Sequence, residues 1–264
     1  MRSADLLLQA PKANPELRNG FWTHGSYINH SCLPNSVRTF IGDIRFMRAT
    51  RDIEVGEEIT NQYISPDIDI EERQANYNAT WAFQCDCELC VVDGNISENV
   101  RKERRRLFEE LKGMVMRLGE KGMTVTSIKK IARALKELEE LYTPSKDGEL
   151  DAYAKLPRLA LVHPTLFLTE AWRNVKNIDK TIDYALKLLR NFGIVVKIEG
   201  SRLDIASNSG MVNVETVRAL RYLAEAYTSK EETELAKQCM DIAHVWYTII
   251  TGTSVGAEEF FGSQ

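Results

Sequence analysis

The 264-residue sequence lacks a long hydrophobic run, a secretory signal and a low-complexity segment. No apolar stretch approaches the roughly 20 residues that a membrane helix needs, so we expect a soluble protein that does not span a membrane. The early run DLLLQA is too short for the apolar part of a signal peptide and is followed by PKANP. An oxidising compartment is therefore not expected.

The sequence also has little net charge, formally −4, which argues against a protein that binds nucleic acid through its overall charge. One local exception is the run RKERRR at residues 101–106. We interpret this run as the solvated face of a helix, with partner binding as the alternative. A hydrophobic content of 44% over 264 residues supports one large or two modest domains.

The texture of the sequence changes once, near residue 97. Before it, short β-type runs alternate with turn signals, and SVRTFIGDIRFMRA predicts a hairpin that turns at Gly42-Asp43. After it, apolar residues recur every three or four positions, which predicts amphipathic helices. We expect these helices at residues 99–119, 125–142, 165–175, 178–192, 214–228 and 231–250.

The chain has only five cysteines, and three of them form the run Cys85, Cys87 and Cys90. A C-x-C-x-x-C run offers three thiolates to a zinc ion, and a tetrahedral structural site needs a fourth ligand from elsewhere. The alternative is a group of free thiols or half of a disulfide. The candidates for the fourth ligand are Cys32, Cys239, His24, His30, His163 and His244.

Three motifs follow one another in a fixed order: NHSCLPN at 29–35, GEEITNQY at 56–63 and CDCELC at 85–90. Together they resemble the C-terminal half of a SET domain with its post-SET zinc segment, the fold of S-adenosylmethionine-dependent protein lysine methyltransferases. The helix that contains Arg73 and the helical region after the cysteines narrow the resemblance to the SMYD group and its fungal SET relatives. The motifs cover about residues 20–92.

The resemblance implies an α+β fold. It places a remnant of a helical insertion at residues 1–20, the C-terminal half of a β-rich SET core at 21–82 and the zinc-bound post-SET segment at 83–97. An all-α domain of helical hairpins, similar to TPR repeats, is expected at 98–264. The Gly-x-Gly strand of a complete SET domain is not found before Gly20, and the zinc-finger insertion of the SMYD group is also missing. We therefore expect this chain to bind the cofactor poorly.

The resemblance also assigns roles to individual residues. Asn29, His30 and Phe83 would bind S-adenosylmethionine, with Phe83 packed on the adenine and His30 contacting it largely through its backbone. Tyr63 would lie at the methyl-transfer site and contact the cofactor there. Cys32 would be the fourth zinc ligand beside Cys85, Cys87 and Cys90. Related proteins often have tyrosine at the position of Trp81, which changes the wall of the lysine channel.

The chemistry of lysine methylation is compatible with a tyrosine at this position. The amine must be neutral to attack a methyl group, whereas free lysine has a pKa of about 10.4. An aromatic channel desolvates the ammonium and lowers its pKa. Tyr63 suits the task of positioning the amine better than that of a strong base. The neighbouring carboxylates Glu57 and Glu58 are more consistent with structural hydrogen bonds than with acid/base catalysis, because adjacent strand residues point to opposite faces.

Two functions follow from these observations. The first is methyl transfer from S-adenosylmethionine to a lysine of a protein substrate, histone or not, in the cytoplasm, the nucleus or both. The alternative is a non-catalytic interaction scaffold held together by zinc. Neither function requires direct binding to a nucleic acid or a membrane. Cys239, within a helical stretch, is expected to be a buried apolar residue, and His163 and His244 show no spacing typical of a metal site.

Overall fold

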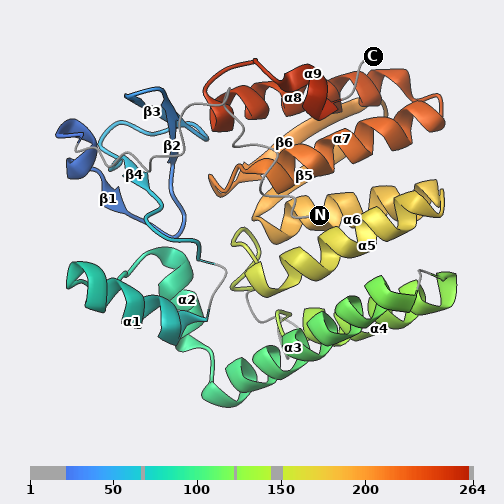
Figure 1. Ribbon diagram of the computed structural model, residues 1–264, viewed down its shortest axis with the longest axis horizontal. Coiled ribbons are helices and arrows are strands. Elements are labelled where there is room, and N and C mark those ends of the chain that lie inside the picture. The colour runs from blue at the N-terminus through green and yellow to red at the C-terminus, as the bar shows by residue number, and fades with distance from the viewer. Residues whose placement is uncertain (1–21, 67–68, 122–123, 144–150, 262–264) are drawn as a thin grey trace.

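A computed structural model describes residues 22–66, 69–121, 124–143 and 151–261. A small lobe of short strands lies on one side, and helices α3 to α8 form a layered array on the other (Figure 1). Helices α1 and α2 join the lobe to this array. The fold is thus α+β with many helices and few strands, as expected. The segment 1–20, assigned above to an insertion, lies outside the described residues.

The predicted hairpin at Gly42-Asp43 is confirmed. Strands β2 (Ser36–Ile41) and β3 (Ile44–Ala49) pair antiparallel, and Ile41 faces Ile44 across the two-residue loop. Gly42 begins this loop with φ +58°. Tight hairpin turns require a positive φ at this position, and glycine adopts it without steric cost.

A second strand pair brings two of the sequence motifs together. Strand β1 (Asn29–His30) runs parallel to β4 (Thr60–Asn61), so that Asn29 pairs with Thr60 and His30 with Asn61. The backbone N–H of Ser31 extends the pairing and donates to the Asn61 carbonyl at 3.1 Å. The NHSC and GEEITNQY motifs are therefore neighbours, although about thirty residues separate them in the chain.

The segment between the lobe and the array contains helices α1 (Ile70–Trp81) and α2 (Glu88–Asn95). The Asp69 side chain caps α1 by accepting a hydrogen bond from the Glu71 N–H at 3.1 Å. Ala82 ends the helix in the left-handed region, with φ +57°, and turns the chain towards the cysteines. Helix α2, with Cys87 as its N-cap and Cys90 in its first turn, is not part of the sequence prediction.

The six helices predicted after residue 97 are all present. Their apolar spacing is clearest in α4, whose four fully buried residues are Ile128, Ile131, Leu135 and Leu138. No described helix is both long and apolar enough to span a membrane. The six helices are α3 (Glu98–Lys121), α4 (Val125–Glu140), α5 (Val162–Asn174), α6 (Ile178–Asn191), α7 (Val214–Ser229) and α8 (Thr233–Thr251), followed by the short α9 (Ala257–Phe261).

The region after residue 97 is not all-α, contrary to the prediction. A second antiparallel hairpin, β5 (Ile194–Glu199) and β6 (Arg202–Asn208), lies between α6 and α7. Its sequence carries the same signals as the first hairpin, because β-branched residues flank a two-residue loop that starts at Gly200 with φ +60°. Gly200 therefore marks a turn between strands and not a break between helices.

Two hydrophobic cores hold the structure together. One lies among α6, α7, α8 and β5 and includes Leu188, Leu220 and Cys239. The other joins helices α3, α4 and α5 to the cysteine segment and includes Leu111, Leu135 and Cys32. The second core thus contains residues from both sides of position 97, so the cysteine segment is packed into the helical part of the protein.

The strand lobe also contacts the far end of the helical array. The Asn208 side chain donates to the Thr50 carbonyl at 3.0 Å, and Arg48 donates to the Gly252 carbonyl at 2.9 Å. Gly210 packs so closely on the lobe that a Cβ there would lie 2.0 Å from the carbonyl oxygen of Pro34. The lobe is therefore fastened at two places, once through α1 and α2 and once through β6 and α8.

Candidate metal centre and adjoining aromatic site

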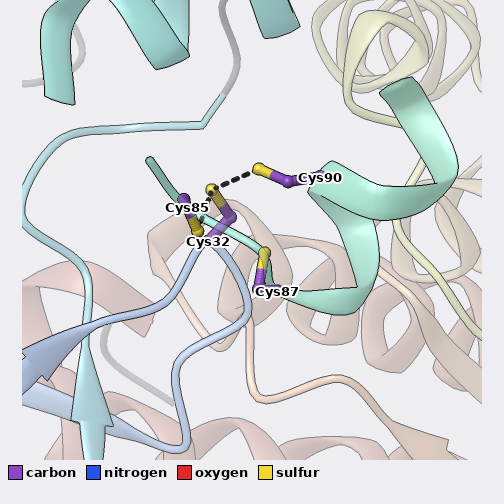
Figure 2. Close-up of side chains that lie close together, drawn as sticks. All are labelled: Cys32, Cys85, Cys87 and Cys90. Atoms are coloured by element: carbon purple, nitrogen blue, oxygen red, sulfur yellow. Dashed lines mark hydrogen bonds between the residues drawn. The ribbon is translucent and has the colours of Figure 1, made fainter. Parts of the chain in front are cut away.

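Four cysteine sulfurs meet where the lobe joins the helices (Figure 2). The Sγ atoms of Cys32, Cys85, Cys87 and Cys90 all lie within 4.8 Å of one another, and Cys32 is 3.5 Å from Cys90 and 4.0 Å from Cys85. A tetrahedral zinc ion with Zn–S bonds of about 2.3 Å separates its sulfurs by roughly 3.8 Å. A disulfide requires about 2.05 Å, so the spacing fits a shared metal and not a covalent bond.

The geometry selects among the candidates for the fourth ligand. Cys32 lies with the three clustered cysteines, whereas Cys239 is buried in α8 within the other core. Burial raises the pKa of Cys239 to about 12, which keeps it a neutral thiol, as the sequence prediction requires. The Nδ1 of His244 donates a hydrogen bond to the Met240 carbonyl at 2.9 Å, and this histidine does not belong to the cluster. The four cysteines could therefore bind zinc.

Residues of α1 hold the cluster in place. The Gln74 amide forms two hydrogen bonds with the backbone of Cys85, donating to its carbonyl at 2.6 Å and accepting from its N–H at 2.9 Å. The hydroxyl of the fully buried Tyr77 lies 3.3 Å from the Sγ of Cys32. Such outer contacts fix the orientation of metal ligands. The chain therefore supplies both the ligands and the groups that orient them.

Protons are shared unevenly among the four sulfurs. The hydrogen bond with Cys85 leads the effects that raise the pKa of Cys32, and the bond with Cys32 leads those that lower the pKa of Cys85. The same partner lowers the pKa of Cys87 to about 6. A divalent cation would have to displace such protons to be held by all four thiolates, so its affinity would fall in acid.

An aromatic group lies directly beside the sulfurs. The ring of His30 is centred 4.4 Å from Tyr77, 5.3 Å from Tyr63 and 5.9 Å from Phe83. Tyr77 stacks on Phe83 at 5.3 Å with an angle of 14° between the rings. Trp81 lies 5.2 Å from Tyr63 and is 41% exposed, so this group reaches the surface. The cysteine cluster thus forms one side of an aromatic site that contains His30, Tyr63 and Phe83.

His30 connects the two halves of this site. Its Nδ1 accepts a hydrogen bond from the backbone N–H of Tyr63 at 3.1 Å, so the neutral ring carries its proton on Nε2. That Nε2 lies 3.5 Å from the Sγ of Cys32 and points its N–H towards the sulfur. Hydrogen bonds of this kind stabilise a thiolate.

The hydroxyl of Tyr63 is held by the backbone. It donates to the carbonyl of Ile28 at 2.8 Å, and its ring lies between His30 and Trp81. The phenol oxygen keeps lone pairs that can accept a hydrogen bond from an incoming amine. This arrangement fixes the side chain in one position, which is what a positioning residue needs.

Asn29 does not join this aromatic group. It is exposed and donates to the carboxylate of Glu58 at 2.6 Å, because neighbouring residues of β1 point to opposite faces. The residues predicted to bind the cofactor therefore divide into two sets. His30, Tyr63 and Phe83 lie together, and Asn29 lies on the other face of the strand.

The carboxylate of Glu57 forms structural hydrogen bonds, as expected. It pairs with Arg51 and accepts from the buried side chain of Asn35 at 3.0 Å. Asn35 also donates to the Glu58 carbonyl and accepts from the N–H of Thr60, at 2.8 and 2.9 Å. The two glutamates and Asn35 thus join the NHSC and GEEITNQY motifs, and neither of these two carboxylates lies in the aromatic site.

Sequence reasoning missed how helix α1 supports the cysteines. Arg73, Tyr77 and Trp81 recur at four-residue spacing and lie on one face of the helix, facing the cluster and the aromatic group. The four-residue spacing of these side chains was the signal available in the sequence. In the basic run, Arg101 and Arg105 pair with Glu71, and Arg106 pairs with Glu103, which gives the helix an ion-paired face. Arg104 of the same run is buried, so the predicted solvated face holds for only part of the run.

Comparison with known proteins finds similarity to one family over part of the chain. Residues 8–64 match the SET domain model. This match begins within the segment assigned above to an insertion and ends before the clustered cysteines. The chain therefore contains SET-domain sequence, and its predicted resemblance to SMYD-like methyltransferases is confirmed by the relatives it matches.

Three of these relatives show how much of the chain is similar. A protein of Gibberella zeae named "Methyltransferase" is 28% identical over 245 residues, which are 89% of this chain and 31% of the relative. The human histone-lysine N-methyltransferase SMYD3 is 41% identical over 75 residues, 28% of this chain and 18% of that protein. The histone-lysine N-methyltransferase SET5 of Yarrowia lipolytica is 37% identical over 67 residues, 25% of this chain and 15% of that protein. The chain thus spans less than a third of each relative.

Proposed function

We propose that this chain is part of a protein-lysine N-methyltransferase that uses S-adenosylmethionine. The observation that carries the proposal is the fixed phenol of Tyr63, bound to the Ile28 carbonyl at 2.8 Å beside an exposed tryptophan. The SET-domain match and the similarity to SMYD3 and SET5, both named histone-lysine N-methyltransferases, support it. The substrate would be a protein lysine, histone or not, in the nucleus or the cytoplasm.

The residues of the aromatic site suit the demands of the reaction. A lysine amine must lose its proton before it can form a bond to a methyl carbon, and aromatic walls make the charged ammonium less stable. Trp81 and Tyr63, 5.2 Å apart, would supply such walls. The Tyr63 oxygen and the Ile28 carbonyl would orient the amine, since both can accept hydrogen bonds. The work of these residues is positioning and desolvation.

The residues present fit the cofactor in part. One face of Phe83 is covered by Tyr77, which leaves its other face for an adenine ring. Asn29 is exposed and could reach the amino-acid end from the opposite face of β1. When bound, S-adenosylmethionine supplies the methyl group.

A structural zinc ion is the second part of the proposal. Cys32, Cys85, Cys87 and Cys90 would hold it as thiolates, in a closed site with no open position for substrate. Zinc would join the NHSC motif to the segment that carries Phe83. The consecutive helices after residue 97, which we interpret as TPR-like hairpins, would form one wall of the path by which the substrate approaches.

The decisive experiment compares Tyr63→Phe with Tyr27→Phe, a control that removes an exposed tyrosine hydroxyl from the same lobe. Both variants are made in the longest natural polypeptide that contains these 264 residues. Transfer of a radiolabelled methyl group to histones and to a lysine peptide library is measured. We expect a roughly hundredfold loss in Tyr63→Phe, with zinc content unchanged, and no loss in Tyr27→Phe. Full activity of Tyr63→Phe would overturn the role of Tyr63.

The non-catalytic scaffold remains the alternative function. It is favoured by the second hydrophobic core, which makes the cysteine cluster part of the helical packing whether or not a cofactor binds. Titration calorimetry with S-adenosylmethionine separates the two functions. Binding by the longest natural polypeptide supports the enzyme, and the absence of binding supports the scaffold.

A further inference from the structure

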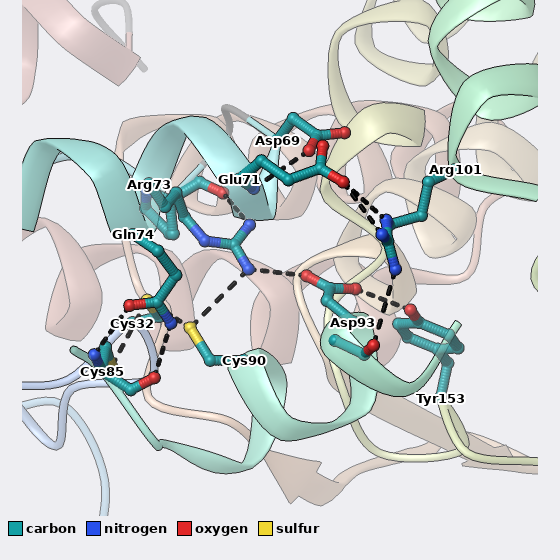
Figure 3. Close-up of polar contacts among 12 residues, drawn as sticks. Cys32, Asp69, Glu71, Arg73, Gln74, Cys85, Cys90, Asp93, Arg101 and Tyr153 are labelled. Carbon is teal, nitrogen blue, oxygen red and sulfur yellow. Dashed lines mark hydrogen bonds and ion pairs between the residues drawn. The ribbon is translucent and has the colours of Figure 1, made fainter. Parts of the chain in front are cut away.

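Arg73 occupies an unusual position for a charged side chain. It lies on α1, is 2% exposed and faces the cysteine cluster. Its Nη2 is 3.8 Å from the Sγ of Cys90 and 2.7 Å from a carboxylate oxygen of Asp93, and its Nη1 donates to the Pro66 carbonyl at 3.1 Å (Figure 3). A buried cation destabilises the folded protein unless it is paired, so the Asp93 carboxylate and the Cys90 sulfur both help to keep Arg73 buried.

The contacts continue from Asp93 into the helical array. The second carboxylate oxygen of Asp93 accepts a hydrogen bond from the Tyr153 hydroxyl at 2.6 Å. That hydroxyl in turn accepts from Arg104 of α3 at 3.0 Å, and Arg104 also donates to the Leu141 carbonyl at the end of α4, at 2.7 Å. An unbroken series of polar contacts thus runs from the sulfur of Cys90 to α3 and α4.

The polar contacts run along the wall of a cavity between the two parts of the protein. A cavity of roughly 600 Å³ lies between α1 and α2 on one side and α3 and the start of α5 on the other. Its wall includes Arg73, Asp93 and Arg104 themselves, together with apolar residues such as Phe108 and Leu159. Apolar contacts of the second core also join the two parts, and the polar series is a further connection that runs beside the cavity.

Charge balance links this series to the metal. Four thiolates with one zinc ion carry a net charge of −2, which Arg73 offsets in part from a distance at which its N–H can reach Cys90. Cys90 and Asp93 lie one turn apart on the short helix α2. A metal that fixes Cys90 therefore also fixes the carboxylate to which Arg73 and Tyr153 bind.

We infer that Arg73, Asp93 and Tyr153 couple metal binding at the cysteine cluster to the attachment of helices α3 and α4. The inference rests on the proposed zinc site and adds a structural consequence of its occupation. Coupling of this kind is reciprocal, so a change in the series also weakens the hold on the metal. Each of the three residues acts through Cys90 and is a positioning residue.

The test measures zinc release to an excess of chelator, followed with a metallochromic dye, in the full chain. Tyr153→Phe removes one hydroxyl from the series, and Tyr227→Phe is the matched control, a buried tyrosine in the other core. We expect release to be about tenfold faster in Tyr153→Phe and in Asp93→Asn, and unchanged in the control. Equal release rates in Tyr153→Phe and wild type would overturn the coupling.

Hydrogen exchange supplies a second readout that does not depend on activity. Zinc removal is expected to increase amide exchange in residues 101–107 of α3 in the wild type, and much less in Tyr153→Phe, where the coupling is already lost. An equal response of the two proteins would again overturn the coupling. A wild-type protein that contains no zinc would instead overturn the metal site, whereas zinc-loaded variants with normal release would leave that site standing without the coupling.

Discussion

The Nε2 atom of His30 lies 3.5 Å from the sulfur of Cys32, while the Nδ1 atom of the same ring accepts the backbone N–H of Tyr63. One imidazole therefore touches the candidate metal centre and the candidate transfer residue. This explains how a structural metal, with no part in the chemistry, would still determine the position of Tyr63.

Replacing His30 tests this connection. In His30→Phe an aromatic ring, somewhat larger than imidazole, is kept, but the Tyr63 N–H loses its acceptor and Cys32 loses a donor. An unsatisfied buried group costs about 1–3 kcal/mol, so we expect a loss of stability in that range, measured by urea unfolding, together with faster zinc release. His24→Phe, at an exposed position of the same lobe, should change neither quantity.

Zinc content tests the choice of ligands. Cys87→Ser and Cys32→Ser should each reduce bound zinc well below one ion per chain, measured by atomic absorption after dialysis, because each removes one of four ligands. Cys239→Ala should keep one zinc ion per chain, since Cys239 belongs to the other core. Full zinc content in Cys32→Ser would contradict the assignment of the fourth ligand.

Glu57 should make the stability depend on acidity. Hydrogen bonding by Arg51, followed by Asn35, lowers the pKa of Glu57 from 4.5 to about 2. A carboxyl whose pKa is lowered on folding stabilises the protein above its unfolded pKa, and this contribution is lost as the pH falls from about 4.5 to about 2. Wild type should therefore be more stable than Glu57→Gln at pH 5, and this advantage should shrink towards pH 2.

Urea unfolding at a series of pH values measures this difference. Zinc release in acid affects both proteins alike, so the comparison isolates the carboxyl group. Arg51→Met should remove most of the same pH dependence. The double variant Arg51→Met/Glu57→Gln should show the same small pH dependence of stability as either single variant. A constant difference between wild type and Glu57→Gln across this range would refute the explanation.

Gly210 is expected to be irreplaceable. Its φ is +88°, and an added Cβ would lie 2.0 Å from the Pro34 carbonyl oxygen, so Gly210→Ala must push the loop away from the lobe. We expect a loss of at least about 2 kcal/mol in urea unfolding. Gly42→Ala is the matched control, because Gly42 has a similar φ of +58° with open space around it, and should cost only about 1 kcal/mol.

Periodic patterns and short motifs predicted much of this structure. Helix α4 and the hairpin at Gly42 follow from local spacing alone, because the residues that form the apolar face and the turn lie close together in the sequence. The hairpin at Gly200 carried equally clear signals, and it was overlooked because it is embedded among helices. The four cysteines were identified as a group only with the help of a family resemblance.

Other features depend on contacts between distant segments and could not be predicted from the sequence. Nothing local indicates that Tyr153 binds Asp93, sixty residues earlier, or that Gln74 forms two hydrogen bonds with the backbone of Cys85. The separation of Asn29 from His30 was, by contrast, implied by the alternation of a strand. This alternation can be used to place the two side chains only once β1 is known to be a strand.

The lobe is attached to the helical array at two separate places, one at each end of the array. The chain leaves the lobe through α1 and α2 and returns to it at Gly210 and Gly252. A hinge at either attachment cannot open while the other holds, unless the helices between them bend. Tyr63 and Gly210 line the same pocket, so any widening of that pocket must be accompanied by movement of the helical array. A mutation at Gly210 should therefore also affect the cysteine cluster.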